Sequence, residues 1–150
     1  MLALICSLIR DFRLVTILAI DDDRNFLRAL GALFAEEGYR VVTANDAESA
    51  IAKAIASRPD VIVTDYMMPG IDGAELCRRL KSNLATVRIP IVMLTALYPP
   101  PSVDEKLWDT LLTKPVPAAR LMSEVRTLLS EAALADPAAA LVAAPAAPRY

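Results

Sequence analysis

Short apolar runs alternate with amphipathic stretches along most of this chain. A run such as Val61-Ile62-Val63, apolar at every position and bounded by polar residues, is typical of a strand buried on both faces of a sheet. Stretches with apolar residues three and four positions apart are typical of helices that cover such a sheet. The pattern predicts strands at residues 16–20, 39–44, 60–65, 89–94 and 111–113, and helices that begin at Arg24, Asn45, Asp72, Ser102 and Pro117.

Capping-box spacing marks the start of three of these helices. In this pattern the side chain of a small polar residue caps the helix N-terminus, and an acid follows three positions later. One such pair precedes a short fourth helix predicted to end near Trp108. Five strands alternating with five helices predict an α/β fold with a parallel sheet, right-handed crossovers and helices on both faces. The capping pairs are Asn45 with Glu48, Asp72 with Glu75 and Ser102 with Glu105.

Composition and charge narrow the classes of function. The 150 residues carry a formal net charge of −2 and no run of lysine and arginine, which argues against direct binding of nucleic acid. The sequence has no histidine, so histidine-based catalysis and histidine metal sites are excluded, and any phosphohistidine must come from another protein. The two cysteines, Cys6 and Cys77, lack metal-binding spacing and indicate a reducing compartment, so we expect a cytoplasmic protein.

We predict one domain over residues 14–131, between two segments of different character. Residues 1–13 form an N-terminal extension of unknown role, whose apolar residues 2–9 are too few to span a membrane and lack the flanks of a signal peptide. This extension is either an extra segment packed on the domain or the result of a start codon assigned too far upstream. Residues 132–150 are rich in alanine and proline and predict a flexible tail. We therefore expect no membrane span and no second domain.

Polar side chains stand at the carboxyl ends of four predicted strands. Asp21 and Asp22 follow the first strand, Asp65 ends the third, Thr95 follows the fourth and Lys114 follows the fifth. Because the carboxyl ends of parallel strands meet at one edge of the sheet, we expect these groups to converge there. Each has a simpler interpretation when taken alone: the aspartates as helix caps, the threonine as a β-prone residue at a turn, and the lysine as a solvated loop charge.

Three carboxylates in one place need a compensating cation. Two carboxylates about 4 Å apart repel by roughly 4 kcal/mol at an effective dielectric constant of about 20, so either their pKa values rise or a metal ion lies among them. Oxygen ligands favour a hard ion, and Mg²⁺ commonly combines one or two carboxylates with phosphate oxygens. With Lys114 and a hydroxyl nearby, the set predicts a phosphoryl-transfer site in which Asp65 is the nucleophile.

Four segments together resemble a known family. Residues 17–23, 61–73, 93–96 and 113–115 read ILAIDDD, VIVTDYMMPGIDG, MLTA and TKP. In this combination they resemble the receiver domain of two-component response regulators, and the resemblance covers roughly residues 14–129. It implies a flavodoxin-like, doubly wound (βα)5 fold, with a five-stranded parallel sheet in strand order 2-1-3-4-5 and helices on both faces.

The resemblance also implies a function and a set of site residues. Asp65 would accept a phosphoryl group from a histidine kinase or a histidine phosphotransfer protein, which makes the protein a signalling phosphoacceptor rather than an enzyme. The signal would pass on by contact with a downstream protein that the sequence does not identify. The implied cofactor is Mg²⁺. Its implied ligands are Asp21, Asp22, Asp65 and the backbone carbonyl of Met67, and the groups that contact the phosphoryl oxygens are Thr95 and Lys114.

The stretch between Thr95 and Lys114 departs from the family pattern. It is shorter than usual, and three consecutive prolines from Pro99 stand where the fourth helix normally begins. Leu111 occupies the position, three residues before the lysine, where these domains commonly carry a switch tyrosine or phenylalanine. We therefore expect phosphorylation to be retained and the readout of phosphorylation to differ from the usual one.

Three functions remain open on the sequence. The first is a stand-alone receiver that is phosphorylated on Asp65 and acts through protein–protein contact. The second is a pseudo-receiver that serves as a constitutive interaction module without phosphorylation. The third, a magnesium-dependent phosphatase, is disfavoured because such enzymes usually carry a second acid where this chain has Met67. A DNA-binding regulator is disfavoured because we expect no output domain after Leu134.

Overall fold

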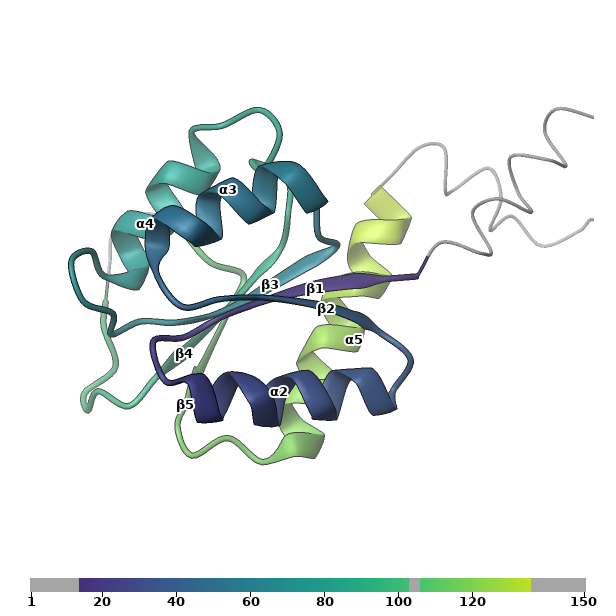
Figure 1. The fold of residues 1–150 in the computed structure, drawn as a ribbon, viewed down its shortest axis with the longest axis horizontal. Coiled ribbons are helices and arrows are strands. Elements are labelled where there is room, and N and C mark those ends of the chain that lie inside the picture. Colours follow the sequence, from purple (N-terminus) through teal and green to yellow (C-terminus); the bar gives the residue numbers. More distant parts are fainter. Residues whose placement is uncertain (1–13, 103–105, 136–150) are drawn as a thin grey trace, which may run out of the picture.

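The computed structural model describes residues 14–102 and 106–135. Within them, five parallel strands form one sheet in the order β2-β1-β3-β4-β5, covered by helices on both faces (Figure 1). The predicted fold class and strand order are confirmed. The strands are β1 (Thr16–Ile20), β2 (Arg40–Ala44), β3 (Val61–Asp65), β4 (Ile91–Thr95) and β5 (Thr110–Thr113), and the helices are α2 (Arg24–Glu36), α3 (Ala47–Ser57), α4 (Gly73–Lys81) and α5 (Ala118–Ala135).

Burial distinguishes the central strands from the edge strands. Every residue of β1, β3 and β4 is buried, whereas β2 and β5 contain exposed and half-buried positions. The register pairs Ile20 with Ala44 and Thr64, and Thr95 with Thr113. Because all five strands run in the same direction, their carboxyl ends are aligned along one edge of the sheet, where the polar residues follow.

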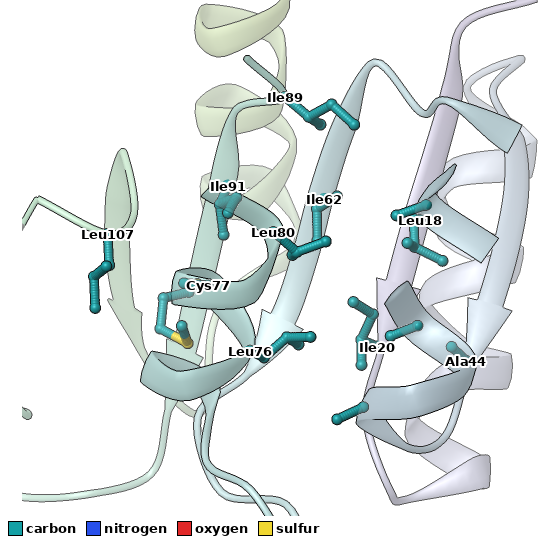
Figure 2. Close-up of a cluster of buried hydrophobic side chains, with 14 of the residues drawn as sticks. Leu18, Ile20, Ala44, Ile62, Leu76, Cys77, Leu80, Ile89, Ile91 and Leu107 are labelled. Carbon is teal, nitrogen blue, oxygen red and sulfur yellow. The ribbon is translucent and has the colours of Figure 1, made fainter. Parts of the chain in front are cut away.

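Two hydrophobic cores lie on opposite faces of the sheet. Helices α3 and α4 cover one face, and α2 and α5 cover the other (Figure 1). In the first core Leu76 and Leu80 of α4 pack with Ile62 of β3 and Leu18 of β1 (Figure 2). In the second, Phe34 of α2 is fully buried. Since a fully buried side chain of this size stabilises the fold by about 1.5–3 kcal/mol, the two cores hold the strand ends in place.

Aspartates cap three of the helices. The carboxylate of Asp23 accepts hydrogen bonds from the N–H groups at the start of α2, and Asp72 does the same for α4, as its spacing predicts. The predicted cap at Asn45 is wrong by one residue, because Asp46 is the N-cap of α3 and accepts a hydrogen bond from the N–H of Ser49. A carboxylate competes well with a carboxamide for this position, so the capping-box spacing did not decide between the neighbours.

No helix lies between β4 and β5 in the part of the chain that the structure describes. Residues 96–102 and 106–109 are non-helical there, so the short helix predicted from Ser102 to near Trp108 is wrong at both of its ends, while Glu105 lies outside the described residues. The three prolines from Pro99 account only for the non-helical chain before Ser102, since consecutive prolines cannot all enter a helix interior. The side chain of Leu107 is instead buried, in the same core as Cys77 and Leu80 of α4 (Figure 2).

The predicted outer segments lie largely outside the described residues. The extension at residues 1–13, with Cys6, is among them, and so is the predicted tail from residue 136. Helix α5 runs to Ala135, past the domain boundary predicted at residue 131. No helix among the described residues is long and apolar enough to cross a membrane.

Candidate functional site

Three carboxylates meet at the carboxyl ends of β1 and β3. Asp21 and Asp22 follow β1, Asp65 is the last residue of β3, and each contributes a carboxylate oxygen within 4.8 Å of the other two. Asp21 and Asp65 are buried, and Asp22 is exposed. The N–H of Asp23 donates to Asp21 Oδ1 at 2.8 Å, which fixes the orientation of that carboxylate. Together with Lys114 these side chains form what we call the acidic pocket.

Lys114 brings a positive charge into direct contact with this cluster. Its Nζ lies 2.8 Å from Asp21 Oδ2 and 3.3 Å from Asp65 Oδ1. The same ammonium lies 4.1 Å from the centre of the Phe26 ring, in a cation–π contact. Its backbone N–H donates to the carbonyl of Thr95 at 2.7 Å, which ties the chain after β5 to the end of β4. The lysine is thus held from both its backbone and its side chain.

The pocket carries more negative charge than Lys114 balances. Burial raises the pKa of Asp65; Lys114 opposes this shift, and the charge of Asp21 adds to it. Burial by itself would lower the pKa of Lys114, but its hydrogen bond to Asp21 and the charges of Asp65 and Asp21 outweigh burial and raise that pKa. Three carboxylates near a single lysine ammonium leave a net negative charge, which a bound cation would offset.

Mg²⁺ fits this set of donors. The cluster offers carboxylate oxygens alone, which suit a hard cation, and the exposed position of Asp22 leaves one side open for water or phosphate oxygens. The carboxylates that could hold the ion are Asp21, Asp22 and Asp65. The acidic cluster is thus of a kind suited to binding magnesium.

Thr95 lies at the next strand end rather than in direct contact with the carboxylates. It is fully buried, and its hydroxyl oxygen accepts a hydrogen bond from the N–H of Leu97 at 3.0 Å. Among the described residues no hydrogen bond joins this hydroxyl to Asp65. Its strand is nevertheless paired with β3, with Asp65 opposite Leu94, so the hydroxyl and the carboxylate stand at neighbouring ends of the sheet.

The chain after β3 is held close to the phosphoacceptor candidate. The N–H of Tyr66 donates to Leu94 O at 2.8 Å, and the N–H of Gly73 donates to Tyr66 O at 2.7 Å. A Cβ added at Gly73 would lie 2.9 Å from the carbonyl oxygen of Asp65, so this close approach requires glycine. Met67, whose backbone carbonyl is a predicted metal ligand, lies in this loop with an exposed side chain.

Two aromatic contacts at the site were not predicted from the sequence. The apolar pattern accounts for Phe26 only as a residue of α2 that packs on the sheet. Its position in the first turn of that helix, just after Asp21 and Asp22, is the sequence feature that could have indicated contact with the pocket. The ring of Tyr66, next to Asp65, contacts the ring of Trp108 edge-on, with centroids 6.3 Å apart. This second contact joins residues far apart in sequence, so no local pattern could have indicated it.

Comparison with known proteins agrees with this geometry. The family described as response regulator receiver domain matches residues 17–126. The chain is 40% identical over 115 residues to response regulator PleD of Caulobacter vibrioides, which covers 75% of this chain and 25% of that protein. It is 39% identical over 119 residues to response regulator MprA of Mycobacterium leprae, covering 75% of this chain and 50% of that protein. The chain therefore spans a quarter to a half of the length of these curated relatives.

A solved structure adds to the likeness. Response regulator protein TrrA of Thermotoga maritima, in complex with Mg²⁺ and BeF, has a TM-score of 0.69 and 29% sequence identity, covering 75% of this chain and 97% of that chain. Family match, relatives, fold and acidic pocket all lead to one assignment. This chain belongs to the response regulator receiver domain family, whose domains are signalling phosphoacceptors rather than enzymes that act on a separate substrate.

Proposed function

We propose that this protein accepts a phosphoryl group on Asp65 from a histidine kinase or a histidine phosphotransfer protein, in a reaction that needs Mg²⁺. The observation that carries this proposal is the acidic pocket itself. It places a buried carboxylate, two further aspartates and a lysine ammonium within a few ångströms of one another at the end of a parallel sheet. These 150 residues contain no histidine, so the phosphohistidine of the proposed donor lies outside them.

Each residue has a definite part in the proposed transfer. An oxygen of Asp65 attacks the phosphorus, the P–N bond to the donor histidine breaks, and an acyl phosphate forms. Lys114, already in contact with the carboxylate, would bind a phosphoryl oxygen, and the hydroxyl of Thr95 would donate to another. Bound Mg²⁺ would offset the negative charge on the phosphoryl oxygens. Asp21, Asp22 and the backbone carbonyl of Met67 would hold the ion, with Asp22 as the more direct ligand of the acidic pair.

Phosphate labelling tests the proposal. The 150-residue chain is incubated with acetyl phosphate, with Mg²⁺ or with EDTA, and the added mass is measured. We expect a single phosphoryl group in the presence of Mg²⁺ that hydroxylamine removes, since hydroxylamine cleaves acyl phosphates. Asp65→Asn should abolish labelling, whereas the control Glu48→Gln, which removes an exposed carboxylate outside the pocket, should be labelled at the wild-type rate.

Trp108 supplies a second readout of the same reaction. It is the single tryptophan of the chain, and its ring contacts that of Tyr66, the residue after Asp65. We expect its fluorescence to change when Mg²⁺ and acetyl phosphate are added together. A protein that is neither labelled nor changed in fluorescence under these conditions would contradict the proposal.

A constitutive interaction module without phosphorylation is the second candidate function. The non-helical stretch after β4 and the leucine at position 111 favour it, because both alter the part of the domain expected to report phosphorylation. The two candidates differ in one variant. A constitutive module binds its partner equally well with Asp65→Ala, whereas a phosphorylation-dependent receiver loses the response to its kinase.

The signal is proposed to pass to a downstream protein by direct contact, in the cytoplasm. That this chain acts as a stand-alone receiver stays a prediction, since its curated relatives are two to four times the length it covers.

A further inference from the structure

A basic cleft lies along the free edge of the sheet, apart from the acidic pocket. Its volume is about 590 Å³, and it is lined by residues of α2, of the edge strand β2 and of α3. Helices α2 and α3 lie on opposite faces of the sheet (Figure 1). Because both helices contribute lining residues, the cleft is bordered from both sides of β2. A volume of this size falls in the range of about 300–1,000 Å³ typical of sites for small molecules.

The charge of the cleft is one-sided. Three of its lining residues are the cations Arg24, Arg28 and Lys53, and none is acidic. Within residues 14–102 and 106–135, neither arginine forms an ion pair or a side-chain hydrogen bond. The neighbouring carboxylates of Asp23 and Asp46 accept N-cap hydrogen bonds from α2 and α3. They are therefore engaged with backbone groups rather than with these cations.

The positions of Arg24 and Arg28 do not stabilise helix α2. Arg24 is the first residue of α2, where the positive end of the helix dipole disfavours a cation. Arg28 follows four positions later, so the two like charges stand on the same face of the helix and repel each other. The arrangement is unfavourable for the helix in isolation and becomes favourable when an anion lies between the two guanidinium groups.

The edge strand adds hydrogen-bonding groups to the cleft. Arg40 N–H and Ala44 O bond to the β1 side, so alternate residues, Val41 and Thr43, direct their backbone groups to the open edge. The carbonyl of Thr43 already accepts a hydrogen bond from Lys53 Nζ at 2.6 Å. This bond holds the lysine charge, which comes from the opposite face of the sheet, at the rim of the cleft.

The floor of the cleft is apolar and has unfilled space. Leu27, Val41 and Ala44 line it together with Gly31, and a Cβ built at Gly31 meets no atom within 4 Å. A flat or apolar group of a ligand can therefore lie against the floor while its anionic groups face the three cations. A concave site with a cationic rim and an apolar floor suits a small molecule with those two parts.

We propose that this cleft binds a small molecule that carries two or more phosphate-type charges beside an apolar part. Guanidinium groups bind such oxygens through paired, charge-assisted hydrogen bonds. The inference goes beyond phosphorylation of Asp65 and does not depend on it, because no residue of the acidic pocket lines the cleft.

Titration calorimetry on the full chain tests the site. The probes are ATP, which combines phosphates with an apolar base, and inorganic pyrophosphate, which lacks the base. EDTA is present throughout to exclude binding through a divalent ion, and salt is kept at about 0.15 M to screen diffuse attraction. We expect both probes to bind, ATP more tightly, and Asp65→Asn to bind as the wild type does.

Two variants test the cleft by different means. Arg28→Gln removes one cation and should weaken ATP binding by about tenfold. Gly31→Leu should abolish binding, because the new side chain enters the open space, and it improves helix propensity, so the variant should fold. The matched control is Arg40→Gln, which removes a positive charge from an exposed residue of β2 outside the cleft and should change binding less than about twofold.

Several results would overturn the proposal. They are the absence of binding of either probe, an equal loss of binding in Arg40→Gln and Arg28→Gln, or wild-type binding in Gly31→Leu. Vesicles of phosphatidylglycerol form a further arm, because a lipid surface also presents phosphates. Binding to vesicles without binding to free ATP or pyrophosphate would place the site on a surface rather than in a cleft and would equally reject it.

Discussion

The acidic pocket and the stretch between β4 and β5 are held in place by different kinds of interaction. In the pocket, Asp21 and Lys114 directly follow β1 and β5, and Asp65 ends β3. Strands β1 and β3 are buried at every position, and ion pairs with Lys114 hold both aspartates. The β4–β5 stretch, residues 96–109, has no helix in its described part. Leu107 and Trp108 attach it to the core, and hydrogen bonds between Asp109 and Ile91 attach its end to β4. The first region agrees with the family pattern, and the second departs from it.

This difference shows that the β4–β5 stretch can vary in sequence and conformation while the acidic pocket is retained. Strand ends are placed by the hydrophobic cores, so the groups that would take a phosphoryl group stay together for as long as the sheet folds. The connection after β4 supplies no group to the acidic pocket, so its conformation can change without moving the pocket residues. In this chain its described part contains three prolines and no helix. We expect changes in the pocket to alter phosphorylation with limited effect on folding, and changes in the β4–β5 stretch to do the reverse.

The largest effect is expected from removal of the lysine charge in the pocket. Lys114→Met leaves the carboxylates of Asp21 and Asp65 without their ammonium and removes a contact to the phosphoryl oxygens. The rate of labelling by acetyl phosphate should fall on the order of 100-fold. Lys106→Met is the control, since Lys106 is exposed in the β4–β5 stretch, and it should be labelled at the wild-type rate. Equal rates in the two variants would remove the distinction between the regions.

Much of the pocket could be predicted because it depends on strand order alone. Apolar runs located the strands, and parallel strands bring their carboxyl ends together, so the sequence alone was enough to expect Asp21, Asp65 and Lys114 at one edge. The position of Phe26 just after the acidic pair places it near the pocket, but its contact with the lysine depends on how α2 packs across the sheet. Orientation of side chains is a property of the packed molecule rather than of local sequence.

The missed helix has a different cause. Ser102 and Glu105 have capping-box spacing, and this local signal predicted a helix, but Ser102 and residues 106–109 are non-helical among the described residues. Burial of Leu107 gives that stretch a tertiary anchor that needs no regular structure. Capping-box spacing alone is therefore weak evidence for where a helix begins, and it also placed the cap of α3 at Asn45 instead of Asp46.

The second prediction tests the anchor of the β4–β5 stretch. Leu107 is 4% exposed, so Leu107→Ala should lower the free energy of unfolding by about 2–4 kcal/mol, measured by urea denaturation. Leu84 is 96% exposed, and the same substitution there should change stability by less than about 0.5 kcal/mol. Folded Leu107→Ala protein should still be labelled on Asp65 at close to the wild-type rate. A stability change as small as that of Leu84→Ala would mean that the stretch is not anchored.

The third prediction concerns the close approach behind the pocket. In Gly73→Ala the new Cβ would meet the backbone oxygen of Asp65 and the end of the Met93 side chain, both at 2.9 Å. We expect a loss of about 1–3 kcal/mol in the free energy of unfolding. Gly31→Ala, in open space on α2, should instead stabilise the protein by about 0.5–1 kcal/mol. Stabilisation by both substitutions would show that the loop after β3 moves away from Asp65 without penalty.

The smallest effect is expected at Tyr98, in the same stretch as Leu107 but 92% exposed. Tyr98→Ser should change the free energy of unfolding by less than about 0.5 kcal/mol.

Cys77 gives a finer test, because it is buried in the same core as Leu107 (Figure 2). Burial raises the pKa of its thiol to about 12. A higher pKa means less thiolate, so at about pH 8 a thiol reagent should react very slowly with it. The measurement uses a Cys6→Ser background, in which Tyr98→Ser should leave Cys77 protected and Leu107→Ala should increase its rate of modification. If Tyr98→Ser exposes Cys77 as Leu107→Ala does, the proline-containing part of the stretch covers the core as well, and the anchor extends beyond Leu107.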